Sequence, residues 1–431
     1  PALRLLRFLR RLARPLPEWL YTEISSFGRR WRQSLLTMWT PGTLFEGLGY
    51  HYLGPINGHD FNQLLPALRH ARAVEEPVLV HVMTKKGKGY QFAEELPGKF
   101  HGIGPFDLAT GKREKSPGPP TYTEVFSDCI REEMVRDERV IAVTAAMPQG
   151  TGLDRAQQEF PGRVYDMGIT EPHCVTFAAG MACEGMRPVV AIYSTFIQRA
   201  YDQLLHDVAL QKLPVVFCLD RAGIVGEDGP THHGLFDLSF LRSMPGMAVL
   251  APADENELRD MLFTALRRND GPVAIRYPRD QATGAPMNAE PSVIPWGKAE
   301  TRREGRDVAI IAAGPIVAAA EEATQLLAAQ GVEATVINAR FVKPLDAETV
   351  VAAANHCGLV VTVEENVIAG GFGSAVVEAL GAAGICAPVL RLGVADDFVT
   401  HGPPEILRRE LGLDGPGIAR SALAFVQSHR K

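Results

Sequence analysis

The chain has 431 residues, of which 46% are hydrophobic and 22% charged, a balance typical of globular proteins. This length allows roughly two to four domains, and the composition excludes wholesale disorder, a collagen-like repeat and a coiled-coil rod. The net charge of −6 argues against a dedicated nucleic-acid binder.

The basic charge is concentrated at the start of the chain. Residues 1–32 contain eight Arg and two Glu, which gives this segment a net charge of +6. The pattern favours a basic connector or surface helix, with an organelle transit peptide or a membrane-surface helix as alternatives. The chain opens with Pro1 rather than Met, so a natural start and a truncation both remain open.

The six cysteines form no CxxC pair, and several lie in apolar segments. This usage is typical of reduced, mostly buried thiols in a cytoplasmic protein. No apolar run reaches the roughly 18 residues of a membrane-spanning helix, so we expect no membrane span.

Two breaks rich in Pro, Gly or Ala divide the chain. They lie at Lys115–Pro120 and Gln281–Pro295. The domains predicted from them are 1–120, 121–287 and 288–431. The first contains too few strands for a complete sheet and is interpreted as the tail end of a domain.

The second and third segments alternate between buried strands and helices. Continuous apolar strands separated by helices predict an α/β fold in which a parallel sheet is covered on both faces, followed by a smaller α/β domain. The expected strands are 140–145, 163–169, 188–193, 214–220, 272–277, 307–313, 333–338, 358–363 and 388–392, and the expected helices of the middle segment are 175–184, 196–212 and 254–268.

Polar side chains follow successive strands of the middle segment. Parallel sheets bind ligands at the carboxyl ends of their strands, so these side chains are candidate site residues. The paired N–H donors of an arginine guanidinium can bind two oxygens of a phosphate group. Glu171 has an alternative interpretation as an acid that stabilises a helix start. The set consists of Glu171, Tyr193, Phe196, Arg221, Asp228, His232, His233, Arg276 and Arg279.

Several motifs resemble those of the 1-deoxy-D-xylulose-5-phosphate synthases, which are thiamine-diphosphate enzymes of the transketolase superfamily. The resemblance runs from about residue 41 to the end, and the stretch 188–279 is nearly diagnostic. The motifs are Pro41-Gly-Thr-Leu-Phe-Glu46, Gly54-Pro-Ile-Asn-Gly-His-Asp60, Met83-Thr-Lys-Lys-Gly-Lys-Gly-Tyr90, Tyr193-Ser-Thr-Phe196, Arg199-Ala-Tyr-Asp-Gln203 and Asp220-Arg-Ala-Gly-Ile-Val-Gly226.

The resemblance implies a decarboxylating condensation of pyruvate with D-glyceraldehyde 3-phosphate. Its product feeds isoprenoid, thiamine and pyridoxal synthesis. Glu171 would hydrogen-bond the aminopyrimidine of the coenzyme, Phe196 would stack on that ring, and Tyr90 matches a further coenzyme contact.

The resemblance also assigns substrate contacts. Arg221 and Arg279 would hold the phosphate of glyceraldehyde 3-phosphate with Tyr193 nearby, and Arg276 is the second choice on its strand. Asp228 and His232 would face the reacting carbons, and His101 resembles a histidine near the substrate oxygens. His233 is interpreted as a solvated loop histidine, and Gly370–Gly373 as a tight turn before a helix.

One part of the family pattern is missing. Family members hold Mg²⁺ and the diphosphate through a Gly-Asp-Gly stretch, and none occurs in this chain. The chain therefore resembles the family without about its first 200 residues. One interpretation is that the chain is a fragment, or a split subunit whose partner chain supplies the metal site. The resemblance also implies that the enzyme is a homodimer and lies in the bacterial cytoplasm. A plastid location remains if the basic start is a transit remnant.

Two other interpretations stay open. The chain is alternatively a split transketolase or a β-type subunit of a 2-oxo acid dehydrogenase. The remaining alternative, of a different class, is a noncatalytic relative that serves as a binding or assembly module.

Overall fold

The computed structural model describes residues 42–112 and 118–429. The basic segment 1–32 and part of the linker at Lys115–Pro120 lie outside the described residues. The chain divides into two compact units, 1–115 and 116–431, which are described separately.

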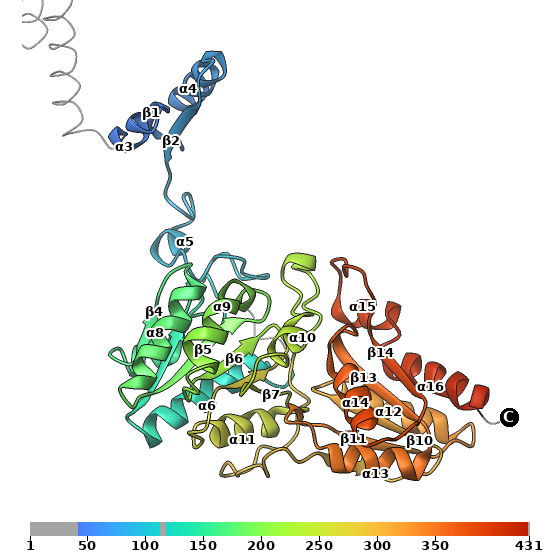
Figure 1. Ribbon diagram of the computed structural model, residues 1–431. Coiled ribbons are helices and arrows are strands. Elements are labelled where there is room, and N and C mark those ends of the chain that lie inside the picture. The colour runs from blue at the N-terminus through green and yellow to red at the C-terminus, as the bar shows by residue number, and fades with distance from the viewer. Residues whose placement is uncertain (1–41, 113–117, 430–431) are drawn as a thin grey trace, which may run out of the picture. The chain divides into compact units, whose positions relative to one another are not determined.

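The described part of the first unit contains a two-stranded parallel sheet. β1 (His51–Asn57) pairs with β2 (Val78–Met83), and α4 (Phe61–Ala73) is the crossover between them (Figure 1). The short helices α3 (Thr43–Gly47) and α5 (Gln91–Glu95) complete this part of the unit. The prediction of an incomplete sheet is confirmed for residues 42–112.

No residue of α4 is buried. Its side chains Phe61, Leu65 and Leu68 are exposed, although their spacing of four and three residues places them on one helical face. A helix face of this kind normally packs against another element.

The second unit contains a seven-stranded sheet with the order β12-β7-β8-β6-β5-β3-β4. Its neighbouring strands are parallel except for β12 and β7. The strands are β3 (Val140–Thr144), β4 (Val164–Asp166), β5 (Arg187–Tyr193), β6 (Val216–Asp220), β7 (Ala248–Leu250), β8 (Val273–Arg276) and β12 (Phe341–Lys343).

Helices cover both faces of this sheet and bury its apolar strands in two cores (Figure 1). One core includes residues of α8, and the other includes residues of α6 and α11. The helical elements are α6 (Tyr122–Arg136), α7 (Asp154–Glu159), α8 (Glu171–Cys183), η1 (Ile197–Ala200), α9 (Tyr201–Gln203), η2 (Leu204–Ala209), η3 (Gly229–Thr231), α10 (Asp237–Leu241) and α11 (Glu255–Ala265).

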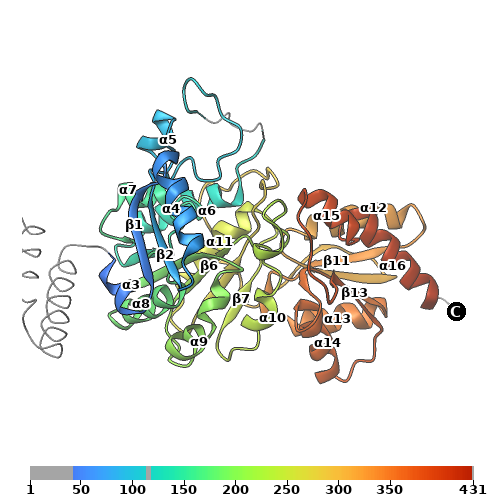
Figure 2. The same ribbon diagram turned by 90° about the horizontal axis from the view of Figure 1, so that it is seen from above.

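A five-stranded sheet follows, with the order β14-β13-β10-β11-β9. Figure 2 shows α12 and α16 lying side by side against it, where they close a third core. Its elements are β9 (Glu300–Arg303), β10 (Val308–Ala313), α12 (Val317–Ala328), β11 (Ala334–Asn338), α13 (Ala347–Cys357), β13 (Val360–Val367), α14 (Phe372–Ala382), β14 (Val389–Val394), α15 (Pro404–Glu410) and α16 (Gly415–His429).

The α/β fold class is confirmed, with one correction to the sheets. Each sheet has an antiparallel edge strand that was not predicted, β12 in the first and β9 in the second. These strands have only three and four residues and are too short to give a pattern of their own. The domain boundaries at 120 and 287 stay a prediction.

Candidate active site

The register of the seven-stranded sheet aligns the carboxyl ends of its central strands. Tyr193, the last residue of β5, pairs with Asp220, the last residue of β6. Leu219 of β6 pairs with Arg276, which ends β8. The loops that follow these strands therefore begin side by side at one edge of the sheet, where ligands of parallel sheets bind.

Glu171 is the first residue of α8, as predicted. Pro172 follows it and suits the first turn of a helix, where no intrahelical N–H bond is lost. The Glu171 side chain is only 4% exposed, and its carboxylate accepts a hydrogen bond from Arg199 Nη1 at 2.5 Å. The carboxylate is thus turned away from bulk water and is held by a single guanidinium contact.

An aromatic cluster lies next to this ion pair. Tyr193 and Phe196 stack with their ring centroids 5.5 Å apart and an interplanar angle of 20°. His232 meets the edge of Phe196 at 5.3 Å, and the Arg199 guanidinium lies 5.1 Å from the centre of the same ring. Three predicted site residues are therefore in contact, and Arg199 connects Glu171 to them. The three are Tyr193, Phe196 and His232.

Arg221 also packs against Tyr193. Its guanidinium carbon lies 4.0 Å from the Tyr193 ring centre, a cation–π distance. Arg221 Nη1 also donates to Asp220 at 2.9 Å and to the Gly150 carbonyl. Asp220 is fully buried and accepts a second bond from Thr123 Oγ1 at 2.8 Å. Burial raises the pKa of the Asp220 carboxyl, an effect that Arg221 opposes. Asp220 and Thr123 therefore fix the orientation of Arg221.

Arg279 and Asp228 form an ion pair with each other. Both side chains are 41% exposed, so either can exchange its partner for a ligand at little cost. Asp228 precedes η3 in the Gly-rich loop after β6, and Arg279 follows β8. The two predicted phosphate ligands thus differ: Arg221 is packed in place and Arg279 is accessible.

Arg276, the second choice for the phosphate, is engaged elsewhere. Its Nε donates to the buried Asp237 at 2.8 Å, and its Nη2 donates to the carbonyls of Gly234 and Glu365. Its side chain is 4% exposed. These bonds use the guanidinium to support the loop, which leaves Arg279 as the accessible arginine after this strand.

The interpretation of His233 as a solvated loop residue is wrong. The residue is 2% exposed. Its Nδ1 accepts from the Val225 N–H and its Nε2 donates to the Thr400 carbonyl, each at 3.0 Å. The loop after β6 packs against residues near 400, which lie 167 positions away and could not be located from local sequence.

Tyr90 and His101 belong to the first unit. Tyr90 donates to the Leu108 carbonyl at 3.0 Å and packs among Phe92, Phe100 and Phe106. His101 is exposed. Their predicted coenzyme and substrate contacts stay predictions.

The residues present fit one half of the implied coenzyme. A buried carboxylate beside stacked aromatic rings suits the polar edge and flat face of an aminopyrimidine. For the diphosphate, no group of three or more His, Cys, Asp or Glu able to hold a metal ion occurs in residues 42–112 and 118–429. α14 begins at Phe372, so only Gly370 and Gly371 of the predicted turn precede the helix, and Phe372 and Gly373 are its first two residues. The Glu364 carboxylate accepts hydrogen bonds from the N–H groups of Phe372 and Gly373, so this helix start is already filled.

Three supporting residues were not singled out from the sequence: Arg199, Asp220 and Thr123. Arg199 lies within a quoted motif, but its pairing with Glu171 depends on how α8 packs against η1. Thr123 lies on α6, 97 residues before Asp220, so no local signal joins them.

Comparisons with known families give three matches. Residues 118–284 match the transketolase pyrimidine binding domain, 297–418 match the transketolase C-terminal domain, and 5–84 match a family described as 1-deoxy-D-xylulose-5-phosphate synthase.

Two relatives named 1-deoxy-D-xylulose-5-phosphate synthase illustrate the similarity. The synthase 1 of Geobacter sulfurreducens is 56% identical over 406 residues, which are 94% of this chain and 64% of the relative. The synthase of Oleidesulfovibrio alaskensis is 50% identical over an alignment of 437 positions, gaps included, which covers 97% of this chain and 68% of the relative. The chain thus spans somewhat under two thirds of the first of these curated relatives.

Two solved structures resemble the fold. A split gene transketolase, described as an inactive β4 tetramer, is 30% identical with a TM-score of 0.63, and the match covers 72% of this chain and 98% of that chain. The transketolase of Leishmania mexicana is 17% identical with a TM-score of 0.62, over 90% of this chain and 68% of the other, and supports the fold alone.

Proposed function

The chain belongs to the 1-deoxy-D-xylulose-5-phosphate synthase family of the transketolase superfamily, and we propose that it carries the pyrimidine and substrate half of that enzyme's active site. The reaction is the thiamine-diphosphate-dependent condensation of pyruvate with D-glyceraldehyde 3-phosphate, which releases carbon dioxide. The proposal is carried by one observation: the buried Glu171 carboxylate is connected through Arg199 and the stacked Phe196 and Tyr193 rings to Arg221.

Each of these side chains has a role in the proposal. The coenzyme, when bound, supplies the carbon nucleophile that attacks pyruvate. Glu171 would hydrogen-bond the edge of the coenzyme's aminopyrimidine, and burial keeps water from competing for that hydrogen bond. Phe196 offers the flat surface, and Tyr90 of the first unit is a further proposed contact.

The acceptor substrate would be held by its phosphate. Arg221 and Arg279 are the proposed ligands, with the Tyr193 hydroxyl beside them. Asp228 and His232 would face the carbonyl that reacts, with His101 as a further polar group. Because Arg279 now pairs with Asp228, phosphate binding would free the Asp228 carboxylate for the reacting end of the substrate.

The diphosphate and Mg²⁺ require a partner site. We propose that a chain or segment carrying the remaining part of the family pattern supplies it, and that the assembled enzyme is a homodimer in the bacterial cytoplasm. Within the described part of the first unit, Phe61, Leu65 and Leu68 of α4 are exposed, and an apolar face of this kind supports such a partner. In the described residues, no helix combines the length and apolar character needed to cross a membrane.

The test is reconstitution. The chain is co-expressed with the amino-terminal domain of a family relative, and carbon dioxide release from pyruvate is measured with thiamine diphosphate and Mg²⁺ present. We expect release that depends on glyceraldehyde 3-phosphate and is lost in Glu171→Gln. A folded complex that binds the coenzyme without any turnover would favour the noncatalytic alternative.

A second candidate is favoured by the match to the split gene transketolase, which covers 98% of that chain. The same reconstituted protein can be supplied with xylulose 5-phosphate as donor. Turnover with this donor and none with pyruvate would support the split transketolase instead. We expect pyruvate to be the donor, because the Asp220–Gly226 loop resembles the synthases more closely.

A further inference from the structure

The Arg199 guanidinium contacts both of the groups proposed to hold the coenzyme's pyrimidine. It donates to the Glu171 carboxylate at 2.5 Å and lies 5.1 Å from the Phe196 ring centre. The guanidinium therefore stands between the carboxylate that would bind the ring's edge and the aromatic face that would bind its plane.

The backbone after β5 explains this position. η1 (Ile197–Ala200) is a 3-10 helix that begins after Phe196, and the Arg199 N–H donates to the Phe196 carbonyl at 3.1 Å. With three residues per turn, side chains at positions i and i+3 of a 3-10 helix are eclipsed. Arg199 is therefore stacked over Phe196, and packing of α8 against η1 brings Glu171 to the same point.

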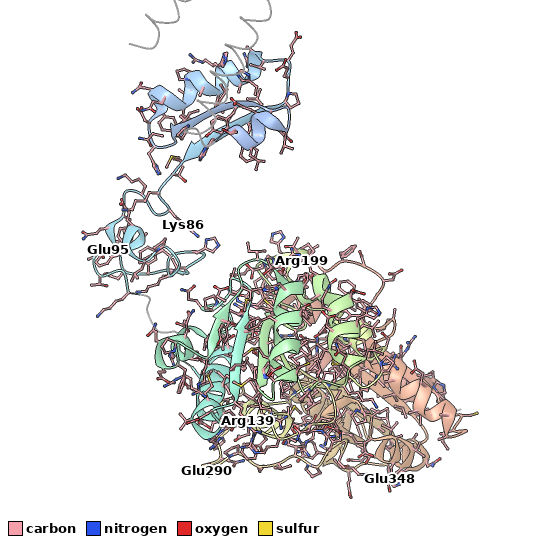
Figure 3. All side chains as sticks on the ribbon, turned by 60° about the vertical axis from the view of Figure 1, so that its left-hand side comes forward. Lys86, Glu95, Arg139, Arg199, Glu290 and Glu348 are labelled. Carbon is pink, nitrogen blue, oxygen red and sulfur yellow. The ribbon has the colours of Figure 1, made fainter. Side chains whose placement is uncertain are left out.

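The two members of the ion pair differ in burial. The Glu171 side chain is 4% exposed, whereas that of Arg199 is 57% exposed. A buried carboxylate without a partner is costly, so Glu171 needs a donor in any state of the protein. Arg199 is mostly exposed, so rotation of its side chain into solvent can break the contact. Figure 3 shows the labelled Arg199 at the surface of the second unit.

The Arg199 guanidinium and the coenzyme's pyrimidine ring can make the same two kinds of contact. Its planar fork of N–H donors on one carbon satisfies a carboxylate, and its flat face suits an aromatic ring. An aminopyrimidine likewise combines a planar N–H donor group with a flat aromatic face, so it can hydrogen-bond a carboxylate and stack on an aromatic ring.

We propose that Arg199 is a displaceable placeholder, which occupies the Glu171–Phe196 site in the free protein and leaves when the pyrimidine binds. This inference rests on the proposed function, because it takes Glu171 and Phe196 as the pyrimidine's partners. Arg199 keeps the buried carboxylate paired in the free protein and limits the site to ligands that can replace a guanidinium.

The consequence is a measurable reduction in affinity. A site that is open in a fraction of molecules binds with its intrinsic Kd divided by that fraction. If Arg199 closes the site in most molecules, its removal tightens pyrimidine binding by about five- to tenfold.

The experiment measures binding of 4-amino-5-hydroxymethyl-2-methylpyrimidine, the free pyrimidine half of the coenzyme, to the full 431-residue chain by saturation-transfer NMR. Arg199→Gln removes the charge and keeps a polar side chain, and Arg199→Lys keeps the charge. We expect five- to tenfold tighter binding in Arg199→Gln and a Kd between those of Arg199→Gln and wild type in Arg199→Lys, because an ammonium can pair with Glu171 but lacks the flat face that covers Phe196. Circular dichroism checks that each variant is folded.

Three further variants make the result specific. Glu171→Gln should weaken binding, and Arg199→Gln added to it should have no further effect, because the competitor then has lost its partner. Arg139→Gln is the matched control, since Arg139 is also an exposed arginine paired with a carboxylate, Asp137, but precedes β3 at the opposite edge of the sheet. It should leave the Kd unchanged.

The outcomes separate this inference from the proposed function. Binding that depends on Glu171 but is unchanged or weaker in Arg199→Gln overturns the placeholder and leaves the proposed function standing. Absence of binding in every variant, or binding that ignores Glu171→Gln, overturns both.

Discussion

Substitution of Arg276, at the end of β8, should lower stability, whereas substitution of Arg279, in the loop after β8, should weaken substrate binding. Arg276 and Arg279 are three residues apart, and from the sequence both are candidates for binding a phosphate. In the structure Arg276 is 4% exposed and paired with Asp237, which is fully buried, whereas Arg279 is 41% exposed. We predict that Arg276→Met destabilises the fold and that Arg279→Gln impairs substrate binding alone.

The magnitude follows from the contacts. Arg276→Met removes the 2.8 Å bond to Asp237 and leaves that carboxylate buried with one backbone donor, the Leu238 N–H at 2.9 Å. Removing one partner of a buried ion pair costs about 3–5 kcal/mol. The exposed pair of Arg279 with Asp228 is screened by water and contributes at most about 1 kcal/mol.

The assay is urea unfolding of the 431-residue chain, followed by circular dichroism. With a slope of about 3 kcal/mol per molar urea, Arg276→Met should lower the midpoint by about 1 M or more. Arg279→Gln should stay close to wild type, and in the reconstituted enzyme it should raise KM for glyceraldehyde 3-phosphate. The double variant Arg276→Met, Asp237→Leu should recover much of the stability, because it removes both charges. Equal midpoints for Arg276→Met and Arg279→Gln would refute the assignment.

Further predictions concern single groups. In the reconstituted enzyme, Glu171→Gln should slow turnover by about 10²–10³, or roughly 2.7–4 kcal/mol, with a modest change in coenzyme affinity, and unchanged turnover would return Glu171 to a helix-start role. Burial raises the pKa of Glu364 to about 7 from 4.5. The folded protein then binds this proton more tightly than the unfolded chain, so stability from this group falls as pH rises through that range. The urea midpoint should therefore drop between about pH 5 and about pH 8 by more in wild type than in Glu364→Gln. Of the six free thiols, Cys183 and Cys386 are exposed and should react with a thiol reagent in the native protein, whereas rapid labelling of all six would contradict the buried positions of the others.

Much of the fold follows from local patterns in the sequence. Strands such as β5 (Arg187–Tyr193) and β6 (Val216–Asp220) are buried on both faces, and their largely apolar sequences predict a covered parallel sheet. Short edge strands have no such run, and β12 enters the first sheet from residues 341–343. Positions at the ends of strands made Glu171, Tyr193, Arg221 and Arg279 candidate site residues, because the carboxyl ends of parallel strands share one edge.

The sequence by itself determined the sheet type, the strand-end candidates and the resemblance that names the chemistry, since each depends on residues close together in the chain. Only the tertiary structure decided which charges are committed to the protein and which are accessible. Arg276 and Arg279 look alike until Asp237 and Asp228 are placed beside them. The same holds for His233, buried against Thr400, and for Arg199, paired with Glu171. A side chain's partners and burial are set by packing between distant segments, and that packing leaves no mark in the local pattern.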